Sequence, residues 1–164
     1  MGLDMYLTKK IYIGAKYEHR EVSGEIDIKV KGTALNINFN RVSEICEEVG
    51  YWRKANQIHH WFVQNVQDGV DDCKSYYVTE EDLKNLLVAI TTVMTDKGTP
   101  NEKDTIAEHL PPFDGFFFGS TDIDEWYWSD LEQTKEIVTE VLREIEQDKK
   151  NEGMWASYYY QSSW

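Results

Sequence analysis

The sequence contains few of the residues that form disulfides or interrupt secondary structure. Only two cysteines, Cys46 and Cys73, and three prolines occur among its 164 residues. Two cysteines form at most one disulfide, and no C-x-x-C spacing connects them, so neither a disulfide framework nor a zinc site is indicated. We therefore expect two free thiols in a reducing compartment, and neither a metal ion nor a cofactor.

Long apolar runs are also missing. No window approaches the ~20 apolar residues that a membrane-spanning helix needs. The segment Met1–Leu7 is too short and too acidic for a signal peptide. We expect a cytoplasmic protein that does not bind membranes.

The third scarcity is positive charge. The chain carries 17 Lys and Arg against 30 Asp and Glu, a net charge of −13. Residues 61–164 hold eight basic and 22 acidic side chains, so the acidity belongs to the C-terminal part. An acidic protein repels phosphate backbones, so nucleic acid is disfavoured as a direct ligand. A host protein with a basic surface is the favoured partner.

The remaining composition is that of a folded protein. Apolar residues make up 41% and aromatic residues 13%, and a chain of this length normally forms one domain. Strand patterns occupy the first forty residues and helical patterns follow, which is typical of an α+β fold. We expect one α+β domain over residues 1–164, in which antiparallel N-terminal strands and a hairpin pack with three or four helices.

The strand predictions come from alternation and residue type. Residues 3–13 mix β-branched and aromatic side chains and predict the first strand. Residues 24–39 alternate on both sides of Lys31-Gly32-Thr33, which predicts a hairpin. Phe116–Phe118, after Asp114-Gly115, predicts a short buried strand. The aromatic tail 154–164 predicts a C-terminal strand.

Helices are predicted from apolar spacing and capping signals. Residues 41–50 favour a short helix, and residues 51–67 favour a second one with an apolar face that includes Phe62. Thr79-Glu80-Glu81-Asp82 is a capping box before a helix that ends near Gly98. Ser129-Asp130-Leu131-Glu132 is a second capping box, which predicts a long helix over 129–147.

The second predicted helix carries the candidate ligand-binding residues. Asn56 and His59 share its apolar face, so their polar atoms are expected to be buried and paired; a structural role is the commoner outcome for such residues. A ligand role would need further polar groups in one cleft. That ligand-binding set is Trp52, Arg53, Asn56, His59, His60, Asp72, Cys73, Ser120 and Thr121.

Two simpler kinds of site, a nucleophilic cysteine–histidine pair and a phosphate-binding loop, have little support in the sequence. Cys73 lies in no activating context, so a Cys73–His59 nucleophilic pair has little support. The segment Gly115–Thr121 resembles a phosphate loop but lacks its lysine and is followed by acids. We assign no catalytic residue, and the protein is more consistent with a non-enzyme.

The last predicted helix carries a row of acids at i+4 spacing. A solvated helix face explains such a row, and so does a surface that binds a basic partner. The candidate partner-binding row is Glu132, Glu136, Glu140, Glu144 and Asp148.

Several longer segments carry a resemblance. They are MGLDMYL at 1–7, YWRKANQIHHWFV at 51–63, VQDGVDDC at 66–73, GFFFGST at 115–121 and YQSSW at 160–164. Together they resemble a family of small, uncharacterised proteins encoded by phages and prophages of Gram-positive bacteria. The resemblance implies a phage origin and no particular activity. Lys74 after the cysteine and Asp122-Ile123-Asp124 depart from the expected pattern.

Two functions compete on these observations. The first is a phage-encoded acidic interaction protein that binds a host protein and inhibits or redirects it. An anti-defence protein that inhibits a nuclease, or an inhibitor of the anti-CRISPR type, is an example. The alternative is a protein or enzyme that binds a small molecule or nucleotide in a polar cleft around Arg53, Asn56, His59, Asp72 and Cys73. The sequence does not set the oligomeric state.

Overall fold

The computed structural model describes residues 2–14, 22–151 and 156–164 and has the predicted α+β architecture. Its main sheet has four antiparallel strands in the order β4-β1-β6-β5. The strands are β1 (Asp4–Tyr12), β4 (Glu44–Arg53), β5 (Tyr76–Val78) and β6 (Ala156–Ser163). Because β6 pairs with β1 from Asp4↔Ser163 to Ile11↔Ala156, the predicted C-terminal strand is confirmed and lies at the centre of the sheet.

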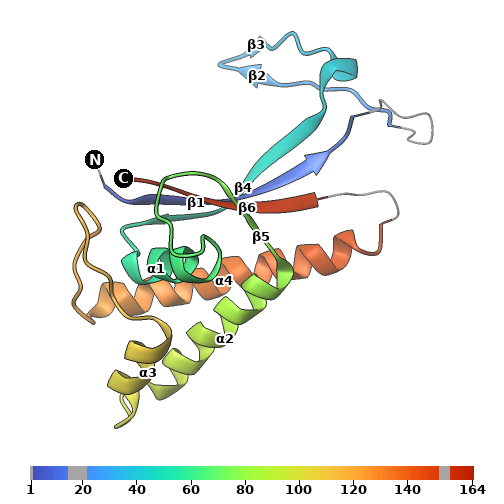
Figure 1. Cartoon of the computed structure of the whole chain (residues 1–164). Coiled ribbons are helices and arrows are strands. Elements are labelled where there is room, and N and C mark those ends of the chain that lie inside the picture. The colour runs from blue at the N-terminus through green and yellow to red at the C-terminus, as the bar shows by residue number, and fades with distance from the viewer. Residues whose placement is uncertain (1, 15–21, 152–155) are drawn as a thin grey trace.

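Four helices accompany the sheet in the described part of the chain. They are α1 (Asn56–Asn65), α2 (Glu80–Asp96), α3 (Glu102–His109) and α4 (Glu125–Asp148). Figure 1 shows α1, α4 and the start of α2 beneath one face of the sheet, with α3 further out beside α2. The apolar core therefore lies between this helical layer and one sheet face.

Alternation along the strands decides which side chains enter the core. On β1, Met5 and Leu7 point into the core. Met5 pairs with Trp52 of β4, and Leu7 pairs with Tyr160 of β6. All four side chains are buried. At Gly50 an added Cβ would lie 2.8 Å from Ile137 Cγ2, so the absence of a side chain lets β4 approach α4 closely.

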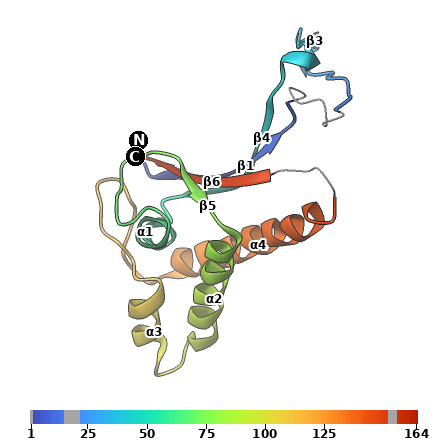
Figure 2. The same cartoon turned by 45° about the vertical axis from the view of Figure 1, so that its right-hand side comes forward.

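An arm formed by residues 22–48 projects away from this domain (Figures 1 and 2). It contains β2 (Lys29–Val30), β3 (Thr33–Ala34) and a short 3-10 helix, η1 (Phe39–Arg41). The predicted hairpin is confirmed, since Lys31 and Gly32 take positive φ values of 49° and 82°, as a tight two-residue turn requires. The hairpin forms its own two-stranded sheet and does not pack with the helices.

The start of the arm coincides with an irregularity in the sheet. The β1–β4 register shifts between Leu7 and Thr8, so Val49 is left without a partner. Gly50 is buried, whereas residues 43–48 are all exposed. Bulges bend the strand that contains them, and this one lies where β4 leaves the domain.

Three local predictions were wrong. Residues 41–50 form η1 and most of β4 rather than a helix, because pairing with β1 overrides their helical spacing. The long helix begins at Glu125 rather than Ser129, because the Asp124 carboxylate caps the amides of Trp126 and Tyr127. Phe116–Phe118 forms a loop, with Phe117 at a φ of 72° and Phe116 81% exposed.

Other helix signals were accurate. Thr79 and Asp82 form the predicted reciprocal capping box at the start of α2. The helix predicted over 51–67 exists as α1, although residues 51–53 belong to β4. Phe62 is fully buried there, while Leu142 of α4 is partly buried against the core. The sequence analysis missed β5 and α3.

Candidate functional site

The predicted ligand-binding residues separate into two places. Arg53, Asn56 and Ser120 line a cleft at the N-terminal end of α4, and His59 belongs to a hydrogen-bonded network between α1 and the C-terminal strand. Trp52 belongs to neither group, because it is 1% exposed and its indole Nε1 donates to Thr134 Oγ1 at 2.9 Å. Thr121 is exposed and does not line the cleft.

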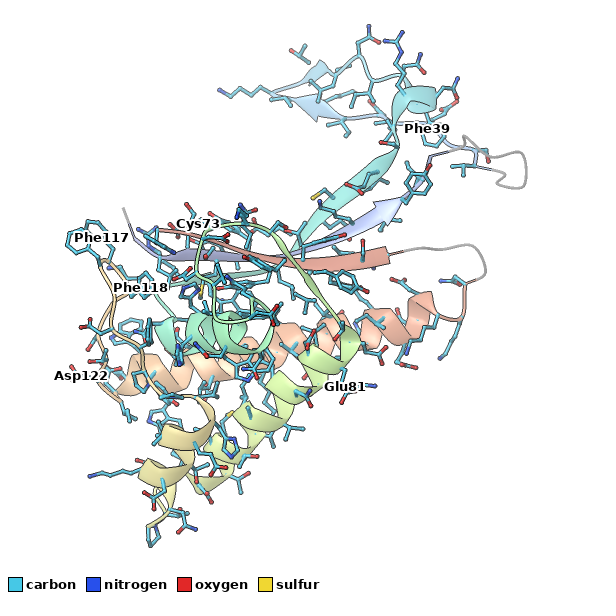
Figure 3. All side chains as sticks on the ribbon, in the orientation of Figure 1. Phe39, Cys73, Glu81, Phe117, Phe118 and Asp122 are labelled. Carbon is cyan, nitrogen blue, oxygen red and sulfur yellow. The ribbon has the colours of Figure 1, made fainter. Side chains whose placement is uncertain are left out.

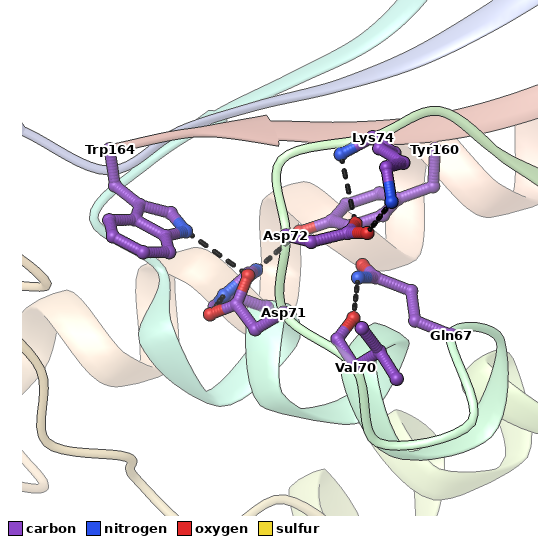
Figure 4. Close-up of polar contacts among 8 residues, drawn as sticks. Gln67, Val70, Asp71, Asp72, Lys74, Tyr160 and Trp164 are labelled. Carbon is purple, nitrogen blue, oxygen red and sulfur yellow. Dashed lines mark hydrogen bonds and ion pairs between the residues drawn. The ribbon is translucent and has the colours of Figure 1, made fainter.

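His59 is the centre of the network. As predicted, it is fully buried and hydrogen-bonded: its Nδ1 lies 2.8 Å from the Tyr160 hydroxyl, and its Nε2 lies 3.0 Å from Asp71 Oδ2. The other Asp71 oxygen accepts a hydrogen bond from the indole of Trp164 at 3.1 Å. Figure 4 shows Asp71 between Trp164 on one side and Tyr160 on the other, next to the loop that follows α1. The network therefore joins α1, this loop and the end of β6.

Burial keeps the Tyr160 hydroxyl protonated. Burial raises the pKa of the Tyr160 hydroxyl well above its usual value, with Asp71 and Cys73 adding to the effect. In the neutral His59 tautomer that carries its proton on Nε2, Nδ1 accepts from the Tyr160 hydroxyl and Nε2 donates to Asp71. Both ring nitrogens of His59 are thereby occupied, which leaves none to activate Cys73.

The loop before β5 has its own polar contacts. Asp72 accepts hydrogen bonds from the Lys74 amide and the Tyr76 hydroxyl and forms an ion pair with the Lys74 ammonium. Hydrogen bonding to Lys74 is the main reason why the pKa of Asp72 is lowered. Cys73 is a partly exposed free thiol at a φ of 56°, and its carbonyl accepts from Gln161. Asp72 and Cys73 thus shape the loop and lie outside the cleft.

Asn56 holds the long loop before α4 in place. It is 2% exposed, and its Nδ2 donates to the carbonyls of Phe118 and Ser120 at 3.3 and 2.8 Å. Its Oδ1 accepts from the Phe113 amide at 2.9 Å. This confirms the prediction that Asn56 is buried and paired. Figure 3 shows this loop along one side of the domain, with Phe117 and Asp122 at its outer surface.

His60 follows His59 but faces a different environment. Its ring stacks on Phe113 with a centroid separation of 4.4 Å. Burial lowers the pKa of His60, with a smaller contribution from His59, and its Nδ1 is buried without a hydrogen-bond partner. His60 packs against the loop and does not line the cleft.

The cleft has a volume of about 370 Å³. It lies where the end of β4, the first turn of α1, the 119–124 loop and the start of α4 meet. Its lining residues are Arg53, Lys54, Asn56, Gln57, Gly119, Ser120, Asp122, Asp124, Trp126, Tyr127 and Asp130. Of the predicted ligand-binding set, Arg53, Asn56 and Ser120 are therefore brought together.

The inner part of the cleft pairs a buried amide with a carboxylate. Gln57 is 2% exposed, and its Nε2 donates to Asp130 Oδ2 at 3.1 Å. Burial raises the pKa of Asp130 to about 6; the hydrogen bond from Gln57 opposes this, and the nearby Asp124 charge adds to it.

The rim of the cleft is charged and aromatic. Arg53 lies 3.6 Å from Asp4, which partly neutralises it. Ser120 Oγ donates to Asp122, and Asp124 caps α4. Trp126 is 72% exposed, whereas Trp52 and Trp61 are buried, so of these three tryptophans only Trp126 can stack on a ligand. Gln57 and Asp130 lay outside the predicted ligand-binding set, whereas Trp126 was expected, with Trp52 and Trp61, to stack on a base.

The predicted acidic row has two different halves. Glu132, Glu136 and Glu140 are exposed on α4. Glu144 and Asp148 instead form ion pairs of 3.0 and 2.8 Å with Lys9, which is only 5% exposed on β1. Although burial opposes its charge, hydrogen bonds to Asp148 and Glu144 raise the pKa of Lys9 above its usual value. These two acids therefore fix α4 to the sheet, and the freely exposed part of the row consists of Glu132, Glu136 and Glu140.

Comparison of the chain with protein-family models, with curated proteins and with solved structures finds no match. Among the described residues, no group of three or more His, Cys, Asp or Glu side chains could hold a metal ion. No helix in the described part is long and apolar enough to cross a bilayer.

Proposed function

We propose that the protein is a phage-encoded interaction protein that binds a host protein through its projecting arm and inhibits or redirects it. The observation that carries this proposal is the arm itself. None of its residues, 22–48, is buried, yet its exposed side chains include several large apolar ones. They are Ile28, Val30, Leu35, Ile37 and Ile45, with exposed fractions of 47, 55, 43, 37 and 42%.

The hairpin pairing gathers three of these side chains, those of Ile28, Val30 and Leu35, on one face. Lys29 is opposite Ala34, and the Leu35 amide donates to the Ile28 carbonyl at 2.7 Å. Ile28 and Leu35 are therefore opposite each other, and Val30, two residues further on, lies on the same face. A two-stranded hairpin is marginally stable without a covered apolar face, and exposed apolar patches commonly mark protein-binding surfaces.

Charge supports a basic partner. Glu44, Glu47 and Glu48 are exposed on the arm portion of β4, around Ile45, and the whole chain carries a net charge of −13. A partner with apolar side chains surrounded by Lys and Arg would complement this surface. Nucleases and other nucleic-acid-binding defence proteins, including those that anti-CRISPR proteins inhibit, have such basic surfaces. The resemblance to phage and prophage proteins supports a phage origin and indicates no target.

The arm can be tested with a matched pair of variants. The double variant Ile28→Ser/Leu35→Ser removes apolar surface from the arm, and Val70→Ser/Val88→Ser removes it from the domain, where both valines are at least half exposed. Each tagged protein is incubated with a lysate of the bacterial host, and captured proteins are compared by quantitative mass spectrometry. We expect one host protein to be retained by the wild type and the control variant and to be lost with the arm variant.

Two results would contradict the proposal. One is equal capture by the arm variant and the wild type. The other is light scattering that finds a wild-type dimer and a monomeric arm variant, because a second copy of the chain would then cover the apolar face. Purified partner binding, measured with and without the arm substitutions, decides between a direct and an indirect contact.

A second candidate function is small-molecule binding, and the cleft at the start of α4 favours it. Three aspartates line that cleft, so the phosphates of a nucleotide would be repelled there.

A further inference from the structure

We infer that the cleft at the N-terminal end of α4 binds a small organic cation, an amine or a guanidine, through Asp130, Gln57 and Trp126. This site is separate from the arm and does not depend on the proposed function. The cleft combines free acceptor atoms, an exposed indole and charged side chains around them.

Two acceptor atoms lie in the inner part of the cleft. Gln57 uses its Nε2 on Asp130, while its Oε1 has no hydrogen-bond partner among the described residues, although the side chain is 2% exposed. Asp130 likewise uses only Oδ2 in the hydrogen bonds of the described residues. Neither Gln57 Oε1 nor Asp130 Oδ1 is among the buried unpaired atoms of the described residues, so solvent reaches both oxygens in the cleft. The N–H groups of a ligand ammonium or guanidinium can replace this water as donors.

The charge on Asp130 also favours a cationic ligand. No Lys, Arg or His among the described residues forms an ion pair with its carboxylate. Burial raises its pKa to about 6, so the ionised form is disfavoured in the free protein. A bound cation would relieve this cost, whereas an anion would increase it. The unfavourable carboxylate is thus consistent with a binding role.

Trp126 supplies the third element. It is 72% exposed, lies in the first turn of α4 and lines the same cleft as Asp130, which follows one turn later. An indole face attracts cations, and tryptophan is the strongest of the aromatic residues in this respect. An exposed Trp beside a partly buried carboxylate is therefore suited to an organic cation with an apolar chain.

The opposite rim limits which cations fit. Arg53 and Lys54 line that side, and they would repel a second positive group placed near them. Arg53 is partly neutralised by Asp4. A monocation whose other end is neutral or anionic, such as an amino acid or its derivative, suits both sides of the cleft. A polyamine with charges at both ends does not.

The inference can be tested by titrating ¹⁵N-labelled protein with n-butylammonium chloride and, separately, with methylguanidinium chloride, with sodium butyrate as the anionic counterpart. We expect saturable shifts of the Trp126 indole N–H and of the Gln57 and Asp130 amides with both cations and not with butyrate. Asp130→Asn should weaken binding by about tenfold or more, because it removes the ligand's charge partner. Trp126→Ala should weaken it by about threefold to tenfold.

A matched control lies on the same helix. Glu132→Gln removes one exposed carboxylate that does not line the cleft, so it should leave both affinities unchanged. The inference is overturned if neither cation gives saturable shifts below about 50 mM, or if Asp130→Asn binds as tightly as the wild type. Equal losses in Asp130→Asn and Glu132→Gln would also overturn it, since they would indicate a general charge effect.

The pH dependence provides an independent readout. Asp122 and Asp124 from the loop and the helix cap, Gln57 from α1, and Arg53 and Lys54 from the end of β4 share the cleft with Asp130. Wild-type affinity for butylammonium should fall as the pH drops through about 6 and Asp130 is protonated. Any residual binding by Asp130→Asn should lack this transition; the same transition in both proteins would assign it to another group.

Discussion

The Nδ1 atom of His59 lies 2.8 Å from the hydroxyl oxygen of Tyr160, which joins α1 to β6 across 101 residues of sequence. Tyr160 also stacks on Phe62, with ring centroids 3.9 Å apart. One tyrosine thus fills the core and completes the polar chain that runs through His59 to Asp71. A Tyr–His–Asp series resembles a catalytic relay, but His59 and Tyr160 are both fully buried, so a substrate has no access to them. The network is structural.

This network makes Tyr160→Phe a test of buried hydrogen bonding. The ring and its stacking remain, while His59 Nδ1 loses its only donor in a site without water access. Leaving a buried polar group unpaired costs about 1–3 kcal/mol, so we expect the free energy of unfolding to fall by that amount in urea titrations. Tyr159→Phe, at a partly exposed position of the same strand, is the control and should change stability by less than ~0.5 kcal/mol. Equal effects would contradict a structural role for the His59–Tyr160 contact.

Lys9 gives a second stability test. Lys9→Met keeps the aliphatic part of the side chain but leaves Glu144 and Asp148 without their cation. Breaking a buried ion pair costs about 3–5 kcal/mol. The two carboxylates are 31 and 17% exposed and can regain some water, so we expect a loss of about 2–4 kcal/mol. Glu140→Gln, one turn before Glu144 and exposed, should have little effect on thermal or urea unfolding. A Lys9→Met protein as stable as the wild type would show that these ion pairs contribute nothing.

Sequence patterns predicted the local parts of this fold. The alternation around Lys31-Gly32, the capping box at Thr79 and the apolar face of α4 depend on residues within one turn or one hairpin of each other. The burial of Asn56 and His59 also followed from helical spacing, because a polar residue on an apolar face must enter the core.

The errors arose where distant contacts override local preference. Residues 44–48 have helical spacing and three glutamates, but they pair with β1, and such pairing outweighs intrinsic propensity. The second capping box competed with Asp124, and nothing in the sequence ranks one cap above the other. The His59–Asp71–Tyr160 chain and the Lys9–Glu144 ion pair join segments that only the tertiary structure brings together.

Because Asp130 is partly buried, its ionisation should lower the stability of the folded protein while it strengthens cation binding. Its pKa in the folded protein is raised to about 6, above the unfolded value of ~3.9. The folded protein then binds more protons than the unfolded chain between these values, so the contribution of Asp130 to stability falls as the pH rises from about 4 to 6 and stays low above 6. Asp130→Asn should therefore be more stable than the wild type at pH 7 by about 1–2 kcal/mol, allowing for solvent screening of a partly exposed group. This advantage should vanish near pH 4. Urea titrations at pH 7, 5.5 and 4 measure it, and a constant difference would assign the effect to something other than ionisation.

The exposed half of the acidic row gives the last prediction. Glu132, Glu136 and Glu140 lie on the outer face of α4, with Lys135 and Arg143 exposed among them, and Arg143 forms an ion pair with Glu140. Glu132→Gln/Glu136→Gln should leave the free energy of unfolding within ~0.5 kcal/mol of the wild type, because exposed charges contribute little to stability. If the row steers a basic host protein toward the arm, the association rate with the captured partner should fall and become less dependent on salt between ~50 and 200 mM, while the dissociation rate stays nearly constant. Ile28→Ser/Leu35→Ser should do the opposite, raising the dissociation rate with little change in salt dependence. Stopped-flow association and dissociation measurements separate the two effects. Identical association rates for the wild type and the glutamine variant at low salt would show that α4 takes no part in partner binding.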